Sequence, residues 1–224
     1  MGAHTKIIEF YGLPGCGKTT ICNKLREIYE TKGYRVAVLP DAANHFSWLS
    51  LLKILSFKDC VLLFRFVSLL YKYHVCRNLV LSPIRRLLIY RCAKMKKEYD
   101  FIFIDHGAVQ SIVRALYDTP CPIDIINSSV IKDLLMINPV DKYVCCQLTP
   151  KVAFSRMRSR NRTNSGTFDQ FPDDQLKKVL EGHNTIFENT DRLLRNLHLN
   201  MKVIDCVKTL EECIQEASNN VINS

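Results

Sequence analysis

The sequence has no apolar run long enough to cross a membrane. Its most apolar region, residues 49–75, is interrupted by Lys53, Lys58, Asp59, Arg65 and Lys72, whereas a spanning helix needs about 20 predominantly apolar residues. The amino terminus also lacks the basic segment and apolar run of a secretory signal. We therefore expect a cytoplasmic protein without a membrane segment.

The sequence also lacks any Cys-x-x-Cys pair, although it contains 10 cysteines. The cysteines lie inside apolar stretches such as Asp59-Cys60-Val61 and Tyr143-Val144-Cys145-Cys146. That setting is typical of small buried side chains in a reducing compartment. We expect neither a disulfide framework nor a zinc site.

No internal repeat or low-complexity linker divides the 224 residues, so we expect one domain over residues 1–224. Acidic residues are in deficit: Lys and Arg number 31 against 22 Asp and Glu, for a formal charge of +9. An excess of this size indicates a polyanionic partner, which could be a nucleotide, a nucleic acid or an acidic surface. Charge alone does not choose among them.

Short apolar segments alternate with longer helical patterns, which predicts an α/β fold with a parallel sheet. A helical insertion, apparently of three helices, is expected at 42–99. Helix starts are predicted at Ser82-Pro83, at Thr149-Pro150 and at the capping box Thr209-Leu210-Glu211-Glu212. The predicted strands are Ile7 to Tyr11, Val36 to Leu39, Phe101 to Ile104, Tyr143 to Leu148 and Met201 to Ile204.

The segment Gly12-Leu13-Pro14-Gly15-Cys16-Gly17-Lys18-Thr19 satisfies the Walker A pattern between a strand and a helix. Its backbone amides and the helix amino terminus would surround phosphate oxygens, and Lys18 would reach the β- and γ-phosphates of ATP. Thr19 would offer its hydroxyl to Mg²⁺. The predicted nucleotide-binding residues are Gly12, Pro14, Gly15, Cys16, Gly17, Lys18, Thr19 and Thr20.

Asp105 follows the apolar strand Phe101 to Ile104, as the acid of a Walker B strand does. Such a carboxylate stands beside the phosphate loop and holds Mg²⁺ or its waters. A helix cap before Ala108 is the alternative role, and both can hold together.

An arginine run follows the fourth predicted strand, at Arg156, Arg158, Arg160 and Arg162. Crowded guanidinium groups repel one another unless an anion compensates them, and they suit phosphoryl oxygens. We expect a lid at 156–168 in which Arg158 binds the nucleotide and the other three arginines act in catalysis. A solvated helix face is the alternative.

Acceptor-side residues are less distinctive. Asp41 ends the second predicted strand, where it could orient or deprotonate an acceptor hydroxyl, or simply cap a helix. Phe46 could stack on a base, although packing explains it as well. Three polar residues at the start of the helix after Asp105 could also reach an acceptor: His106, Gln110 and Arg114.

From about residue 6 to residue 205 the chain resembles the thymidylate kinase and deoxynucleoside kinase branch of the P-loop kinases. The resemblance lies in Gly12 to Thr20, Asp41, Asp105, the arginines at 156–162 and a long helix from about Asp173 to Leu197. It implies a five-stranded parallel sheet and transfer of the γ-phosphoryl group of ATP, with Mg²⁺, to a nucleoside monophosphate or nucleoside. A homodimer is a further expectation.

The acceptor half departs from that family, because His106-Gly107 stands where these kinases usually have an arginine after the acid. A kinase of a non-nucleotide metabolite therefore stays open, as does a nucleic-acid-linked or regulatory ATPase. Nucleic acid is a less favoured partner, because the basic residues of the insertion alternate with apolar ones at helical spacing. A GTPase is disfavoured, since no Asn-Lys-x-Asp motif is present.

Overall fold

A computed structural model describes residues 5–39, 55–73, 77–96, 98–117, 119–160, 168 and 170–222. Its centre is an all-parallel sheet of five strands in the order β2-β3-β1-β4-β5. This confirms the predicted α/β fold. The strands are β1 (Lys6–Tyr11), β2 (Val36–Leu39), β3 (Phe101–Ile104), β4 (Lys142–Gln147) and β5 (Met201–Asp205).

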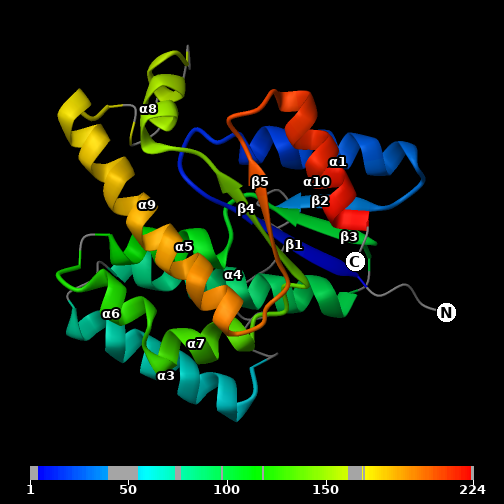
Figure 1. Cartoon of the computed structure of the whole chain (residues 1–224). Helices are drawn as coiled ribbons and strands as arrows, with labels where there is room; N and C mark the ends of the chain where they lie inside the picture. The colour runs from blue at the N-terminus through cyan, green and yellow to red at the C-terminus, as the bar shows by residue number, and fades with distance from the viewer. Residues whose placement is uncertain are drawn as a thin grey trace.

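Helices cover both faces of the sheet (Figure 1). α1 (Lys18–Thr31) and α10 (Leu210–Ile222) pack together on one face. On the other face, α5 (Ala108–Leu116) packs between α4 (Arg77–Lys96) and α9 (Asp173–Asn196). The remaining described helices are α3 (Phe57–Lys72), α6 (Pro122–Ile126), α7 (Ser129–Met136) and α8 (Pro150–Arg158).

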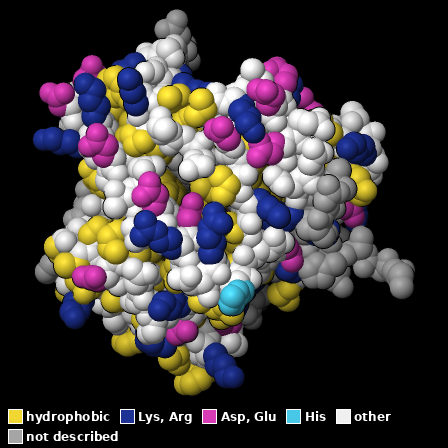
Figure 2. Space-filling model, viewed as in Figure 1, with side chains coloured by type: hydrophobic (Ala, Val, Ile, Leu, Met, Phe, Trp, Pro, Cys, Tyr) yellow, Lys and Arg dark blue, Asp and Glu magenta, His cyan; other side chains and the backbone are white. Residues whose placement is uncertain are grey.

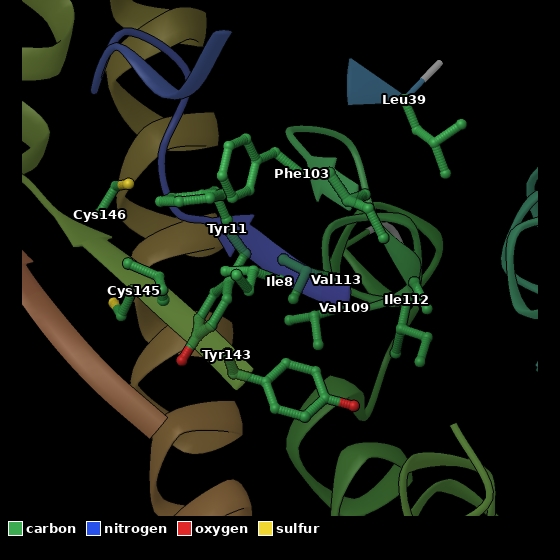
Figure 3. Close-up of a cluster of buried hydrophobic side chains, with 14 of the residues drawn as sticks. Ile8, Tyr11, Leu39, Phe103, Val109, Ile112, Val113, Tyr143, Cys145 and Cys146 are labelled. Carbon is green, nitrogen blue, oxygen red and sulfur yellow. The ribbon is translucent and has the colours of Figure 1, made fainter. Parts of the chain in front are cut away.

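The core is one continuous cluster between the sheet and its helices. Figure 3 shows a part of it, where Val109, Ile112 and Val113 of α5 lie beside side chains of β1 and β4. Short, fully apolar strands such as Phe101–Ile104 are buried on both sides, as parallel strands require. This packing fixes the edge of the sheet at which β1 and β3 end.

Two predicted helix starts are confirmed. The Thr149 hydroxyl caps α8 by accepting a hydrogen bond from the Val152 amide at 3.4 Å. Thr209 and Glu212 form the predicted capping box of α10, with the Thr209 amide 2.9 Å from the Glu212 Oε2 atom. Local signals sufficed here because both partners of each cap lie within four residues.

The start predicted at Ser82-Pro83 was wrong, because α4 begins at Arg77 and runs through Pro83. Proline favours a first turn, because inside a helix it removes one backbone hydrogen bond and its ring clashes with the carbonyl group four residues earlier. The helix α4 continues through Pro83 despite this cost. Within the predicted insertion, α3 and α4 are the helices that lie in the described residues. An ion pair of 2.6 Å between Arg91 and Asp59 joins them.

All nine described cysteines are free thiols. The expectation that the cysteines are buried was wrong for Cys60 and Cys121, which are exposed. Cys60 lies on the outer side of an amphipathic helix, a placement that its apolar neighbours in the sequence do not reveal. In the described part of the chain, no group of His, Cys, Asp and Glu side chains could hold a metal by itself, and no helix is long and apolar enough to cross a membrane.

Candidate phosphate-binding site

The Walker A segment forms a tight loop between β1 and α1, at the carboxyl end of the central strand. Gly12 begins the loop with a φ angle of 143°, which L side chains rarely adopt. A Cβ atom on Gly12 would lie 2.4 Å from the carbonyl oxygen of Cys146. Glycine is therefore required here by both conformation and space.

Lys18 is folded onto this loop and is only 6 % exposed. Its ammonium group donates to the carbonyl oxygens of Gly12 at 2.9 Å and Leu13 at 3.0 Å, and to the Cys16 Sγ atom at 3.3 Å. Hydrogen bonds from the Cys146 thiol and the Lys18 ammonium lower the pKa of Cys16 to about 6, although burial opposes them. The Lys18 ammonium group is thus held by hydrogen-bond acceptors of the loop itself.

Thr19 and Asp105 meet at the end of β3. The Thr19 hydroxyl donates to Asp105 Oδ2 at 2.7 Å. Asp105 is 2 % exposed, and its Oδ1 atom has no hydrogen-bond partner in the described residues. A buried carboxylate oxygen without a partner is costly unless something binds it. Two oxygen groups of this kind fit Mg²⁺, which prefers such ligands.

The helix-cap alternative for Asp105 is not what the structure shows, because α5 has Gly107 as its N-cap residue and no side-chain cap from that residue. Asp105 is instead directed at Thr19. Asp105 therefore ends the strand β3, whereas the N-cap residue of the following helix is Gly107.

The first turns of α5 form a second wall beside the loop. The Gly12 amide donates to Gln110 Oε1 at 3.3 Å, which links the loop to the helix. His106, Gln110 and Arg114 line the same cavity as the loop. Partial burial lowers the pKa of His106; Asp105 opposes this effect, while the cations Lys18, Arg86 and Arg114 add to it. A neutral imidazole at neutral pH follows.

The cavity has a volume of about 210 Å³ and continues to the end of α8. Arg160 and Phe168 form its third side, and Phe168 in turn packs edge-on against His183 of α9 at a centroid distance of 5.7 Å. One cavity therefore joins the loop, α5 and one arginine of the predicted lid. The lining residues are Pro14, Gly15, Gly17, Lys18, Thr19, Thr20, His106, Gln110, Arg114, Met157, Arg160 and Phe168.

Two other arginines of the run have different surroundings. Arg158 forms an ion pair of 2.8 Å with Asp173 at the start of α9 and also donates to the carbonyl oxygen of Phe171. Arg158 therefore has a compensating acid from the next helix of the chain, in place of the nucleotide that the lid prediction assigns to it. Arg156 lies near Cys213 of α10, where burial raises the pKa of the thiol to about 11 and the Arg156 charge opposes that increase.

Three predicted site residues, Asp41, Phe46 and Arg162, lie outside the described residues. The sequence analysis did not single out Glu9, a fully buried acid in the middle of β1. The signal was present, since Glu9 interrupts the apolar run Ile7 to Tyr11. Its partner, the Val109 amide, is 100 residues away, and no local pattern points to it.

Comparison with solved structures supports the fold. A structure of deoxyadenosine kinase from M. mycoides with bound dATP has 18 % sequence identity and a TM-score of 0.52, over 98 % of this chain and 100 % of that one. A second structure of that enzyme, with the products dCMP and a flexible dCDP bound, has 14 % identity and the same TM-score, over 96 % and 98 %. The chain has a P-loop kinase fold. No model of a known protein family and no curated protein matches its sequence.

Proposed function

We propose that this protein is an ATP-dependent phosphotransferase that moves the γ-phosphoryl group of ATP to a hydroxyl of a nucleoside. The observation that carries the proposal is that one cavity is lined by the phosphate loop, by Thr19, which donates to Asp105, by α5 and by Arg160. A hydrolase needs the phosphate side of such a cavity only. The polar wall of α5 offers a place for a second substrate.

In this proposal the loop amides and Lys18 bind the β- and γ-phosphates, and Lys18 exchanges its contacts with loop carbonyls for phosphate oxygens. Thr19 and Asp105 would hold Mg²⁺, which neutralises phosphate charge when bound. Arg160 stabilises negative charge on the group in transfer. Closure around the cavity excludes water and so favours transfer over hydrolysis.

Two features favour a nucleoside over a nucleoside monophosphate. His106 follows Asp105, at the position where the resembled kinases commonly carry an arginine, and its lowered pKa leaves it neutral, so it offers no cation to an acceptor phosphate. Arg114 is the remaining described cation of the α5 wall. The compared structures, of a deoxyadenosine kinase, agree with a nucleoside acceptor. Asp41 is proposed to orient the acceptor hydroxyl, and Phe46 to stack on its base.

The test is incubation with γ-labelled ATP, Mg²⁺ and separate panels of nucleosides, nucleoside monophosphates and other hydroxylated metabolites. We expect label on a nucleoside and none in the Lys18→Ala variant. Label on a monophosphate would change the acceptor class, and label on another metabolite would refute a nucleoside acceptor. Release of inorganic phosphate alone, stimulated by nucleic acid, would overturn the proposal in favour of an ATPase.

We also propose that α3 pairs two copies of the chain. Phe57, Phe64 and Tyr71 recur every seven residues and are 84 %, 72 % and 82 % exposed. Val61 and Val67 lie between them on the same side. A seven-residue apolar stripe is the seam of a helix pair, and two such stripes would bury on the order of 1,200 Å², the lower limit of a specific interface.

Sedimentation velocity tests this pairing. Phe64→Glu should shift a dimer to a monomer, whereas Met95→Glu, which places the same charge at an exposed apolar residue of α4, should not. A native protein that sediments as a monomer at micromolar concentration, or a Phe64→Glu variant that stays dimeric, contradicts the assignment.

A further inference from the structure

Glu9 is an acid in the central strand of the sheet and is 0 % exposed. It is flanked by Ile104 of β3 and Tyr143 of β4 in the strand register. A carboxylate in such a place is strongly disfavoured unless charges or hydrogen bonds compensate it. Its partners therefore indicate why the chain keeps it.

The partner of Glu9 is the amino terminus of α5. The Val109 amide donates to Glu9 Oε1 at 2.7 Å, and the amides of Ala108 and Gln110 also favour the ionised carboxylate. The N-cap residue Gly107 provides no side-chain cap. Glu9 thus does from another strand what an N-cap side chain usually does, with the helix dipole adding to the attraction.

Gly107 is matched to this arrangement. A Cβ atom on Gly107 would lie 2.0 Å from Glu9 Cδ and 2.1 Å from Glu9 Oε1. Because backbone and carboxylate are in contact, any larger residue would displace the carboxylate or the helix. The two residues form one built unit, although 98 positions separate them in the sequence.

The same helix carries the second wall of the cavity beside the phosphate loop, from His106 just before its start to Arg114 in its last turn. His106, Gln110 and Arg114 line that cavity, and Gln110 binds the first amide of the loop. Glu9 is itself only three residues before Gly12 on β1. A displacement of the α5 terminus relative to β1 would therefore misplace the acceptor wall relative to the phosphates.

We propose that Glu9 is a positioning residue whose carboxylate fixes the start of α5, and with it His106, Gln110 and Arg114, against the phosphate loop. The proposal rests on the proposed phosphotransferase function for its kinetic consequences. Its structural part, the attachment of α5 to β1 by a charged cap, stands separately.

The charge on Glu9 titrates near neutral pH. Burial raises the pKa of Glu9 from 4.5 to about 7, against the opposing effects of the α5 amides and of Arg86 on α4. The other titratable groups near it are Tyr11 of β1, Tyr90 of α4 and Tyr143 of β4. Protonation would remove the charge that the helix terminus attracts. Activity should therefore fall as the pH is lowered through about 7.

The effect on stability has the opposite sign. Because the pKa of Glu9 in the folded chain lies above its ordinary value, the folded state binds the proton more tightly than the unfolded state does between about pH 4.5 and 7. The contribution of Glu9 to the free energy of unfolding therefore decreases as the pH rises through that window. The ionised form of Glu9 is therefore expected to raise activity and to lower the free energy of unfolding.

The test is Glu9→Gln in the full chain, since glutamine keeps the Oε1 acceptor and removes the charge. We expect kcat to fall at least tenfold at pH 8, the acid limb near pH 7 to disappear, the KM for ATP to stay within about threefold, and the melting temperature at pH 8 to rise. Glu212→Gln is the matched control, because Glu212 caps α10 away from the cavity, and it should leave kcat, the acid limb and the KM for ATP unchanged and should not raise the melting temperature.

Amide hydrogen exchange gives a readout independent of activity. Exchange at Val109 should accelerate at least tenfold in Glu9→Gln at pH 8, and in the native chain when the pH is lowered from 8 to 6, after correction for intrinsic rates. If exchange changes but no acceptor is phosphorylated, the proposed function fails and the attachment stands. Native kcat with an intact acid limb in Glu9→Gln, or unchanged Val109 exchange, overturns the positioning role. Should Glu9→Gln not fold, Gly107→Ala, which displaces the carboxylate without removing its charge, still tests the attachment through faster Val109 exchange and lower kcat at pH 8.

Discussion

The two sides of the phosphate cavity are built differently. On one side, the loop, β3 and α5 are joined by hydrogen bonds from Lys18 to the loop, from Thr19 to Asp105 and from Gly12 to Gln110. On the other side, the arginine run does not act as one unit, since Arg160 lines the cavity while Arg158 is paired with Asp173. Hydrogen bonds between rigid elements thus hold Lys18, Thr19 and Gln110 in place without a ligand. Of the two arginines, only Arg160 lines the cavity.

The largest effect is expected at the arranged side. Lys18→Ala should lower turnover by about 10³-fold or more, because it removes the loop cation that faces the phosphates. The circular dichroism spectrum should stay native, since Lys18 bonds only within its own loop. Turnover above one tenth of the native value would show that the cavity is not the phosphate site.

Arg160→Ala should have the next largest effect, a decrease of about 10²–10³ in kcat with a smaller change in ATP affinity. A cation that acts mainly on charge developed during transfer changes kcat more than ground-state binding. Steady-state kinetics with ATP varied at saturating acceptor would measure both. A change of less than about threefold would make Arg160 a solvated residue of the cavity rim.

His183 supports the Phe168 side of the cavity and is expected to make stability depend on acid pH. Burial lowers its pKa from 6.5 to about 4, and the charges of Arg114 and Lys18 add to this decrease. The unfolded chain therefore binds the proton first, so stability is complete above about pH 6.5 and decreases as the pH falls through about 4. The shift corresponds to about 3 kcal/mol.

Urea unfolding at several pH values, with the native chain and His183→Gln, would measure that contribution. Glutamine does not titrate, so the variant should lose less stability than the native chain between pH 6.5 and 4. Parallel curves for the two proteins would place the acid sensitivity elsewhere.

The smallest effect is expected for Arg158→Ala. Its ion pair with Asp173 is partly accessible to solvent, with 30 % of the Arg158 side chain and 64 % of the Asp173 side chain exposed, so its loss should lower the free energy of unfolding by about 1 kcal/mol or less. We expect kcat within threefold of the native value. A decrease in kcat as large as that of Arg160→Ala would show that Arg158 and Arg160 do not differ in their roles.

The sequence predicted the strands and helices around the cavity well because their signals are local. Gly12 to Thr19 is a contiguous motif, Asp105 directly follows an apolar strand, and the caps at Thr149 and Thr209 act within four residues. Fully apolar strands alternating with helices were sufficient for the parallel sheet. The roles of the individual side chains in catalysis remain predictions.

Long-range partners could not be predicted in the same way. Glu9 depends on an amide 100 residues away, and Arg158 on Asp173, the acid at the start of the next helix. Both contacts exist only because the fold brings separate elements together. The helix start predicted at Ser82-Pro83 was wrong for a different reason. A proline favours the first turn of a helix, but here it lies inside α4 despite the cost of that position.

A nucleic-acid partner, which the sequence disfavours, would need positive charge clustered on a face of the molecule. In Figure 2, Lys and Arg side chains are interspersed with Asp and Glu among the described residues of that face. Mixed charge over α9 is typical of a solvated surface. The excess of positive charge is therefore not concentrated on this face.

The central claim is that the phosphate loop and the end of β3 form one site for Mg²⁺ and nucleotide. Calorimetric titration with a non-hydrolysable ATP analogue, with and without Mg²⁺, tests it most directly in the native chain and in Asp105→Asn. Asparagine keeps an oxygen near Thr19 but removes the charge that Mg²⁺ requires. We predict that Mg²⁺ tightens binding at least tenfold in the native chain and less than threefold in the variant. An equal gain from Mg²⁺ in both proteins would contradict the account.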